Sequence, residues 1–289
     1  MLLLSAASPQ VKEHAATSMS ATMTVGASFN NDGVIQGNFD GGHRAHRARD
    51  AVVRLGGAAA VVALVRSDNP AVLRAGVLLL LLLSNGQAEV VRSAGGVPVV
   101  VALLATARDA VLQAQAAGLL GNIASLGSAG RQSVLESGGL ATVLPLLQSS
   151  HGPTQANATA LCAHFASDLS NTSAIIDSGG VQALVTLVQR SRFDPGGVSG
   201  GAGTGGGGGD GGSGTCAHAA TALAKLLCAG PREKALVIGA GAVEALLSLE
   251  ARTHARLAIH CRTQQSKPQT LHVIFYSKTM REKRTTVEN

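Results

Sequence analysis

Two short patterns in the glycine-rich stretch near residue 200 could carry catalytic chemistry. Gly197–Gly201 spells G-x-S-x-G around Ser199, the pattern of a serine nucleophile held on a tight turn between a strand and a helix. The same stretch contains G-x-G-x-x-G spellings, which in a nucleotide-binding fold follow a strand and begin a helix. Neither pattern has those elements beside it. We therefore predict no catalytic residue and no cofactor, and a hydrolase acting through Ser199 is the least favoured alternative.

Cysteine and histidine also occur as close pairs that could bind a metal. Cys216 lies near His218, and His260 is followed by Cys261. A structural zinc site needs four convergent ligands, whereas these pairs are isolated, so we predict no metal. The four cysteines are widely separated and form no C-x-x-C pair, which is typical of a reducing compartment.

The elements that must position any functional group are set by a repeated pattern. Five times a glycine pair, or its near copy, begins an apolar stretch, and the first glycines are separated by 39, 43, 41 and 62 residues. A period near 40 indicates a helical solenoid, in which each unit buries its apolar face against its neighbours. The copies are Gly56-Gly57-AAAVVALV, Gly95-Gly96-VPVVVALL, Gly138-Gly139-LATVLPLL, Gly179-Gly180-VQALVTLV and Gly241-Ala242-VEALLSL.

Each unit is predicted to hold three helices, with glycine ending the first because it adopts a left-handed conformation without strain. The apolar stretch is the second helix. The first helices are expected at Arg47–Arg54, Gln87–Ser93, Gly130–Ser137, Thr172–Ser178 and Arg232–Gly239. The third helices are expected at Pro70–Leu83, Asp109–Ser125, Pro153–Ser167 and Thr215–Cys228.

The chain divides into a repeat domain at 43–250 and two flanking segments. Residues 1–42 are rich in small and polar residues and are expected to be disordered. Residues 194–214 are predicted to be a flexible, Gly-rich insertion in the fourth unit, and removing about 21 residues there restores the period. Residues 251–289 form a degenerate basic tail, which incorrect gene-end annotation would also explain.

Composition and charge exclude several classes of function. The chain has 36 Gly, 5 Phe, 1 Tyr and no Trp, which does not fit an enzyme core built on aromatic residues. Its net charge is +6, but residues 43–250 carry only +2 and residues 251–289 carry +6. Nucleic acid is therefore a disfavoured partner for the repeat domain. The apolar run Val77–Leu83 is too short to span a membrane. We expect a cytoplasmic or nuclear monomer, with organelle targeting by residues 1–42 left open.

The three-helix unit resembles the armadillo repeat, with HEAT-type repeats as close relatives. The best match is QAAGLLGNIASL (Gln115–Leu126), preceded by AGGVPVVVALL and followed by RQSVLESGGLATVLPLL. The fold class is thus an all-α, right-handed α-solenoid of four units and a partial fifth. The resemblance implies a concave groove lined by third helices, on which a recurring asparagine, here Asn122, binds the backbone of an extended peptide. Members that read basic peptides carry a tryptophan four residues earlier, where this chain has Gly118.

Helical spacing places further polar residues on the face that holds Asn122. A seam of small residues, including Gly76 and Gly118, lies between two polar rows and would let an extended chain approach. Solvation alone would also explain such a polar stripe. The predicted partner-binding residues are Gln115, Asn122, Asn157, His164, His218 and Lys225.

The sequence thus predicts a non-enzymatic scaffold that binds an extended segment or a helix of a partner protein. Replacing Asn122 and His164 together is expected to weaken that binding. Two alternatives remain open: a fragment or paralogue of a multidomain armadillo protein of the ubiquitin-ligase or vacuole-tethering type, and a nucleic-acid binder acting through its basic tail. The start Met1-Leu2 lacks the glycine that myristoylation requires.

Overall fold

Glycine separates the first helix from the second in every unit. The five glycines that lead the apolar stretches have φ between +65° and +82°, where the Cβ of any other residue would be strained. Each ends one helix, and the next helix begins directly after it. The predicted helix boundaries at these positions are therefore confirmed. The residues are Gly56, Gly95, Gly138, Gly179 and Gly241.

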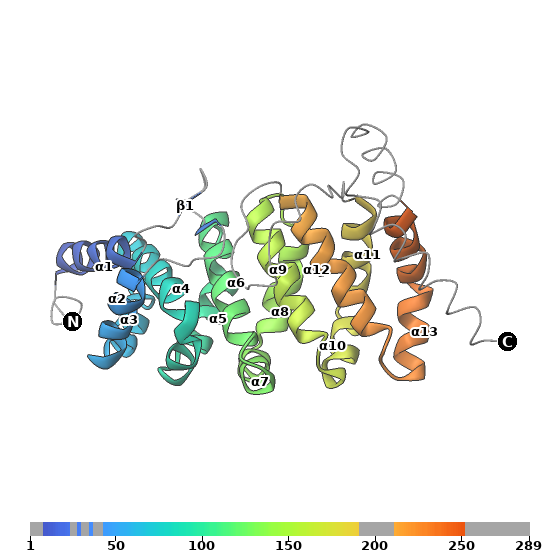
Figure 1. The fold of residues 1–289 in the computed structure, drawn as a ribbon, viewed down its shortest axis with the longest axis horizontal. Coiled ribbons are helices and arrows are strands. Elements are labelled where there is room, and N and C mark those ends of the chain that lie inside the picture. Colours follow the sequence, from blue (N-terminus) through green and yellow to red (C-terminus); the bar gives the residue numbers. More distant parts are fainter. Residues whose placement is uncertain (1–7, 24–27, 30–34, 37–42, 191–210, 252–289) are drawn as a thin grey trace, which may run out of the picture.

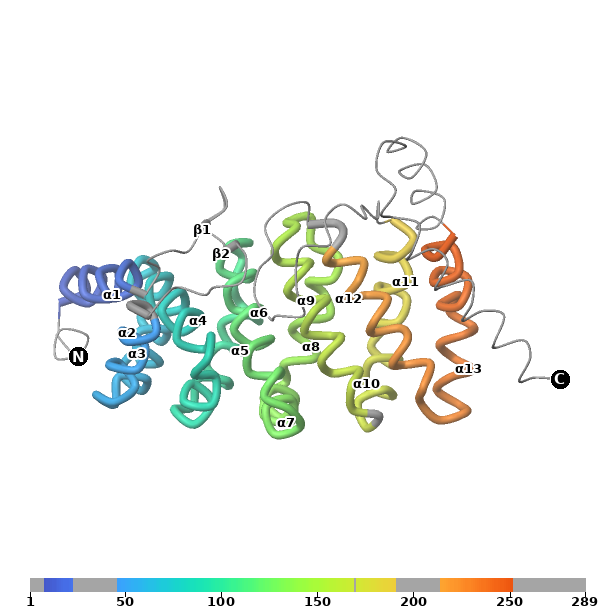
Figure 2. The backbone as a smooth tube through the Cα atoms, in the orientation of Figure 1, coloured from blue at the N-terminus to red at the C-terminus, as the bar shows by residue number. Residues whose placement is uncertain are grey.

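The computed structural model describes residues 8–23, 28–29, 35–36, 43–190 and 211–251. Its helices stack in one elongated row, an all-α solenoid (Figure 1). The helix α1 (Pro9–Met23) lies at one end of the row and α13 (Pro231–Gly239) lies at the other (Figure 2). The predicted fold class is confirmed.

The helices fall into the three predicted positions of the unit. The first helices are α2 (His43–Arg54), the end of α4 (Pro70–Ser93), α7 (Ser128–Glu136), α10 (Thr172–Asp177) after the 3₁₀ turn η3 (Leu169–Asn171), and α13. The second helices are α3 (Gly57–Leu64), α5 (Gly96–Thr106), α8 (Gly139–Val143) continued by the 3₁₀ helix η2 (Leu144–Gln148), α11 (Gly180–Arg190) and residues 242–251. The third helices are the first part of α4, α6 (Ala110–Ala124), α9 (Gly152–Phe165) and α12 (Gly211–Leu226).

The third helices form a continuous layer. Each packs along the next, from α4 through α6 and α9 to α12, and these contacts are far more extensive than those between consecutive second helices. Their buried faces carry Leu, Ala, Val and Ile, for example Leu79, Leu119 and Leu161. Side chains of this size allow close approach of stacked helices. The surface that this layer presents to solvent is called the third-helix face below.

The long helix α4 is two helices in sequence. Asn85, Gly86 and Gln87 have non-helical backbone angles, and Gly86 has φ +92°. The break lies where the first unit was predicted to end. By length and composition alone α4 could cross a membrane, but half of its apolar window is buried within the protein, and α4 packs on α1, α3 and α6. In this fold α4 is a core helix.

The N-terminal segment differs from the disorder that the sequence predicted. Helix α1 packs on α2 and α4, with Ala16 and Ser20 buried and Met19 against the core. Its small residues let it lie close to α4, and it covers the end of the row, where a repeat array needs a cap. A two-residue antiparallel pair follows, β1 (Ser28–Phe29) with β2 (Ile35–Gln36). The other residues of 1–42 lie outside the described part.

The Gly-rich insertion leaves the helical stacking intact. Helix α12 packs on α9 and α11, as the third helix of the fourth unit should. It begins at Gly211, so the prediction of a flexible loop over residues 194–214 is wrong for residues 211–214. Residues 191–210 lie outside the described part of the chain, as do residues 252–289 of the predicted basic tail.

The last described unit leaves an apolar side chain uncovered. Leu247 occupies the sixth position of its second helix and is 59% exposed. The equivalent residues of earlier units, Val101 and Val185, are 4% and 1% exposed because neighbouring helices cover them. Within residues 211–251 the fifth unit has a first and a second helix but no third helix. The part of the chain that would complete the predicted fifth unit lies outside the described residues.

Candidate partner-binding site

The six predicted site residues all lie on third helices, two on each of α6, α9 and α12. Their surroundings differ along the row. Those of α6 are buried, those of α9 are partly exposed, and those of α12 are partly or largely exposed. The pairs are Gln115 and Asn122, Asn157 and His164, and His218 and Lys225.

Asn122 joins two neighbouring units. Its Nδ2 donates a hydrogen bond of 2.8 Å to Oγ of Ser84 on α4, whose hydroxyl donates in turn to the carbonyl of Leu81. Asn122 is 9% exposed and Gln115 is 7% exposed. A buried amide that is already bonded stabilises the stack more directly than it can contact a partner. Stacking of α6 on α4 therefore accounts for Asn122.

Asn157 makes a similar connection from α9 to α6. Its Nδ2 donates to the carbonyl oxygen of Ala114 at 2.8 Å, and Oγ1 of Thr154 donates to the carbonyl oxygen of Ala110, also at 2.8 Å. A Cβ added at Gly118 would lie 3.1 Å from Nδ2 of Asn157. Glycine at this position therefore makes room for the bridging amide.

The predicted seam of small residues is not continuous. A Cβ at Gly76 would lie 2.8 Å from Cβ of Leu64 and 3.2 Å from the backbone nitrogen of Val65. Gly76 therefore faces α3 in the interior, where the two helices approach closely. Its small size serves packing between helices of one unit, and the seam prediction is wrong at this end of the row.

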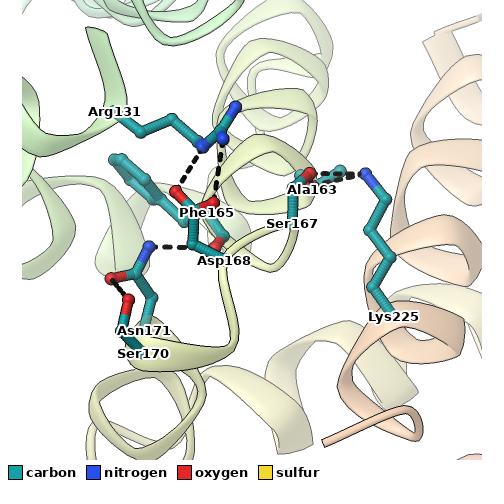
Figure 3. A network of polar contacts seen from close by, with 8 residues as sticks. All are labelled: Arg131, Ala163, Phe165, Ser167, Asp168, Ser170, Asn171 and Lys225. Carbon is teal, nitrogen blue, oxygen red and sulfur yellow. Dashed lines mark hydrogen bonds and ion pairs between the residues drawn. The ribbon is translucent and has the colours of Figure 1, made fainter. Parts of the chain in front are cut away.

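Lys225 connects α12 to the end of α9. Its Nζ donates to the carbonyl oxygen of Ala163 at 3.0 Å and to Oγ of Ser167 at 2.8 Å (Figure 3). The last carbonyls of a helix lack partners within it, and a cation there is favoured by the helix dipole. Residues 163 and 225 are 62 apart, the same as the long step between glycines, so the insertion preserves the register of stacking.

Two further contacts at the end of α9 were not predicted. Arg131 of α7 binds both carboxylate oxygens of Asp168, at 2.5 and 2.8 Å, and lowers the pKa of that carboxyl group (Figure 3). Asn171 donates to the carbonyl oxygen of Phe165 at 3.1 Å. The partners Arg131 and Asp168 are 37 residues apart, and only the repeat period would have suggested that they meet.

The two histidines are held near positive charge. Burial, and then the charges of Lys225, His218 and Arg131, lower the pKa of His164 to about 4. His218 is exposed, but neighbouring atoms partly desolvate its ring, and this and then the charge of Lys225 lower its pKa. Both rings are therefore neutral at pH 7, and each can donate one hydrogen bond and accept one.

The lowered pKa of His164 gives stability a pH dependence. Unfolded chains take up a proton near pH 6.5, whereas folded His164 stays neutral until about pH 4, so acid favours the unfolded state within this window. The contribution is complete above pH 6.5 and is lost as the pH falls toward 4. We expect the melting temperature to fall less between pH 7 and pH 5 in His164→Gln than in the wild type. If the melting temperature fell equally in both proteins, the lowered pKa of His164 would not explain the pH dependence of stability.

The fold and this face define a class of protein: an α-solenoid of three-helix units joined by polar contacts between third helices. The family described as Armadillo/beta-catenin-like repeat matches residues 84–125, which span one complete unit through α5 and α6. No curated protein matches the chain. Residues 84–125 thus match this repeat in sequence, and the described chain has the fold of an armadillo-repeat solenoid.

Solved structures similar to this chain cover most of its length. An engineered protein of the Northeast Structural Genomics Consortium is 25% identical, covering 86% of this chain and 85% of its own, with a TM-score of 0.65. A structure of computationally designed armadillo repeat proteins for modular peptide recognition is 19% identical, with coverages of 90% and 96% and a TM-score of 0.68. A designed armadillo repeat protein in complex with the peptide (KR)4 is 19% identical, with coverages of 89% and 96% and a TM-score of 0.65.

Proposed function

We propose that this armadillo-repeat scaffold binds an extended segment of a partner protein on its third-helix face, across α9 and α12. The observation that supports this most directly is the partial exposure of polar side chains there. Asn157 and His164 on α9 and Lys225 on α12 are partly exposed, and His218 on α12 is exposed, on a rigid stack. Because the stack is preorganised, binding requires little ordering on the protein side.

The peptide-binding designs support the same proposal at the level of fold. Their helices follow this chain over most of its length, and one of them is solved with a peptide. The contacts of the six predicted residues decide which of them are available to bind a partner. Asn122 and Gln115 are buried in the stack, so the binding function is assigned to the other four predicted residues.

Peptide selection on the full chain tests this proposal. A displayed library of random peptides is enriched on the immobilised protein, and hydrogen exchange is then measured with and without the enriched peptide. We expect slower exchange in α9 and α12, and binding that is lost in the His164→Ala/His218→Ala double variant. Asn122→Ala serves as the packing control, because it should lower thermal stability while keeping most of the affinity. Protection confined to first helices such as α7 and α13, or no enrichment at all, would refute the proposal.

A further inference from the structure

The third helices that the structure describes carry no acidic residue. Their sequences, from Pro70 to Ser84 and in α6, α9 and α12, contain Arg74, His164, His218 and Lys225 but no Asp or Glu. Carboxylates lie just outside the ends of these helices at Asp68, Asp109 and Asp168, and arginine binds the last two. Asp109 contacts Arg74 at 2.8 Å, and Asp168 is bound by Arg131.

Three basic side chains gather where α9 and α12 meet, and they are named here the basic cluster: His164, His218 and Lys225. Nζ of Lys225 lies 3.0 Å from the carbonyl oxygen of Ala163, the residue before His164. His218 precedes Lys225 by two helical turns and so lies on the same side of α12. His218 is exposed and the other two are partly exposed.

No carboxylate of the described residues is among the groups that shift the pKa values of the cluster. The groups that lower the pKa of its members are other cluster members and Arg131 of α7, all of them positive or able to become positive. Arg131 already has its own carboxylate in Asp168. Lys225 uses two of its three N–H groups on Ala163 and Ser167, which leaves one directed donor. The cluster therefore offers donors and positive potential to an incoming anion.

We propose that the basic cluster binds carboxylate side chains of an acidic, extended segment of a partner protein. This rests on the proposed function and adds the charge of the partner to it. The imidazole N–H groups and the third N–H of Lys225 donate to the carboxylates, and the added negative charge relieves repulsion within the cluster. Because a bound carboxylate favours protonated histidine and the free histidines have lowered pKa values, affinity increases as the pH falls below about 6.5.

The same charges argue against two other ligands. A basic peptide such as the (KR)4 bound by a designed neighbour would meet no free carboxylate on the described third helices. A nucleic acid is bound mainly through roughly 6–10 phosphate contacts with lysine and arginine, whereas this cluster holds one permanent cation. An acidic protein segment, by contrast, needs opposite charge only where its few carboxylates meet the cluster.

Three labelled peptides test the inference by fluorescence anisotropy on the full chain. They alternate glycine with Glu, Gln or Lys over about twelve residues, long enough to cross three helices spaced about 10 Å apart. A single-stranded oligonucleotide is the fourth probe. We expect the Glu peptide to bind at least about tenfold more tightly than the Gln peptide. Its affinity should fall about tenfold in Lys225→Gln and in His218→Glu, and should not change in the control Lys234→Gln on α13.

The outcomes separate the partner's charge from the function itself. Equal binding of the three peptides, or tightest binding of the Lys peptide, overturns the charge inference and leaves the proposed function standing. Tightest binding of the oligonucleotide overturns the assignment of a protein partner. If Lys234→Gln loses affinity and the cluster variants do not, the basic cluster is not the binding site of the Glu peptide. Because His218 is exposed, His218→Glu should fold even if Lys225→Gln weakens the stacking of α12 on α9.

Discussion

Replacing Phe165 by alanine is expected to lower the free energy of unfolding by about 3–5 kcal/mol. Phe165 is the last residue of α9 and is fully buried, the one aromatic side chain among the largest buried residues of the described chain. Its removal leaves a cavity in a core built mainly from Leu, Val, Ala and Ile, whose side chains cannot extend to fill it. Its backbone carbonyl also accepts the hydrogen bond from Asn171.

Urea unfolding followed by circular dichroism measures this effect. The matched control is Leu126→Ala, which removes an apolar side chain that is 43% exposed just after α6 and should change the unfolding free energy by less than about 0.5 kcal/mol. Because α9 contacts both α6 and α12, the loss should affect the whole array rather than one unit. A change below about 1 kcal/mol for Phe165→Ala would show that the site collapses around the gap.

The architecture could be predicted from sequence because its determinants are local and repeated. A glycine with positive φ marks the same boundary five times, and one apolar pattern follows each. Asn69 and Asp109 cap the third helices through their side chains, and Pro70 begins one of them. Helix caps and glycine turns are determined within a few residues, so they can be predicted without knowing the tertiary contacts.

Helix α1 escaped prediction because its signal is weak. The residues that it buries, Ala16 and Ser20, are small, and its sequence has little separation of apolar from polar faces. Small residues favour close packing only if a partner helix is present. That partner is α4, which follows much later in the chain, and no local sequence pattern predicts the contact between them.

The helices that carry the predicted site residues could be predicted, but the contacts of those residues could not. Spacing along a helix places Asn122, Asn157 and Lys225 on third helices, as found. It does not give the distance between neighbouring helices, and that distance decides whether an amide faces solvent or bonds to the next unit. The structure brings Asn122 to Ser84 and Asn157 to Ala114, so part of the predicted polar row holds the stack together.

The second glycine of each pair gives the other large expected effect. In the third unit, a Cβ at Gly139 would overlap Cγ1 of Val134 and lie 2.7 Å from the backbone oxygen of Val134. Gly96 and Gly180 face the equivalent carbonyls of Val91 and Ile175 at 2.9 Å. The first glycine thus supplies a backbone angle, and the second lets two helices approach.

Gly139→Val is therefore expected to lower the unfolding free energy by about 3 kcal/mol, because overpacked cores must shift backbone or adopt strained rotamers. Gly139→Ala should lower the unfolding free energy by less, since the fifth unit accommodates Ala242 at the equivalent position. The control is Gly121→Ala in α6, where an added Cβ meets open space and should raise stability by about 0.5–1 kcal/mol. The prediction is tested by ranking the three variants in urea. If Gly139→Val matched the wild type, the close approach of α7 and α8 would not explain the second glycine, and its recurrence would need another cause.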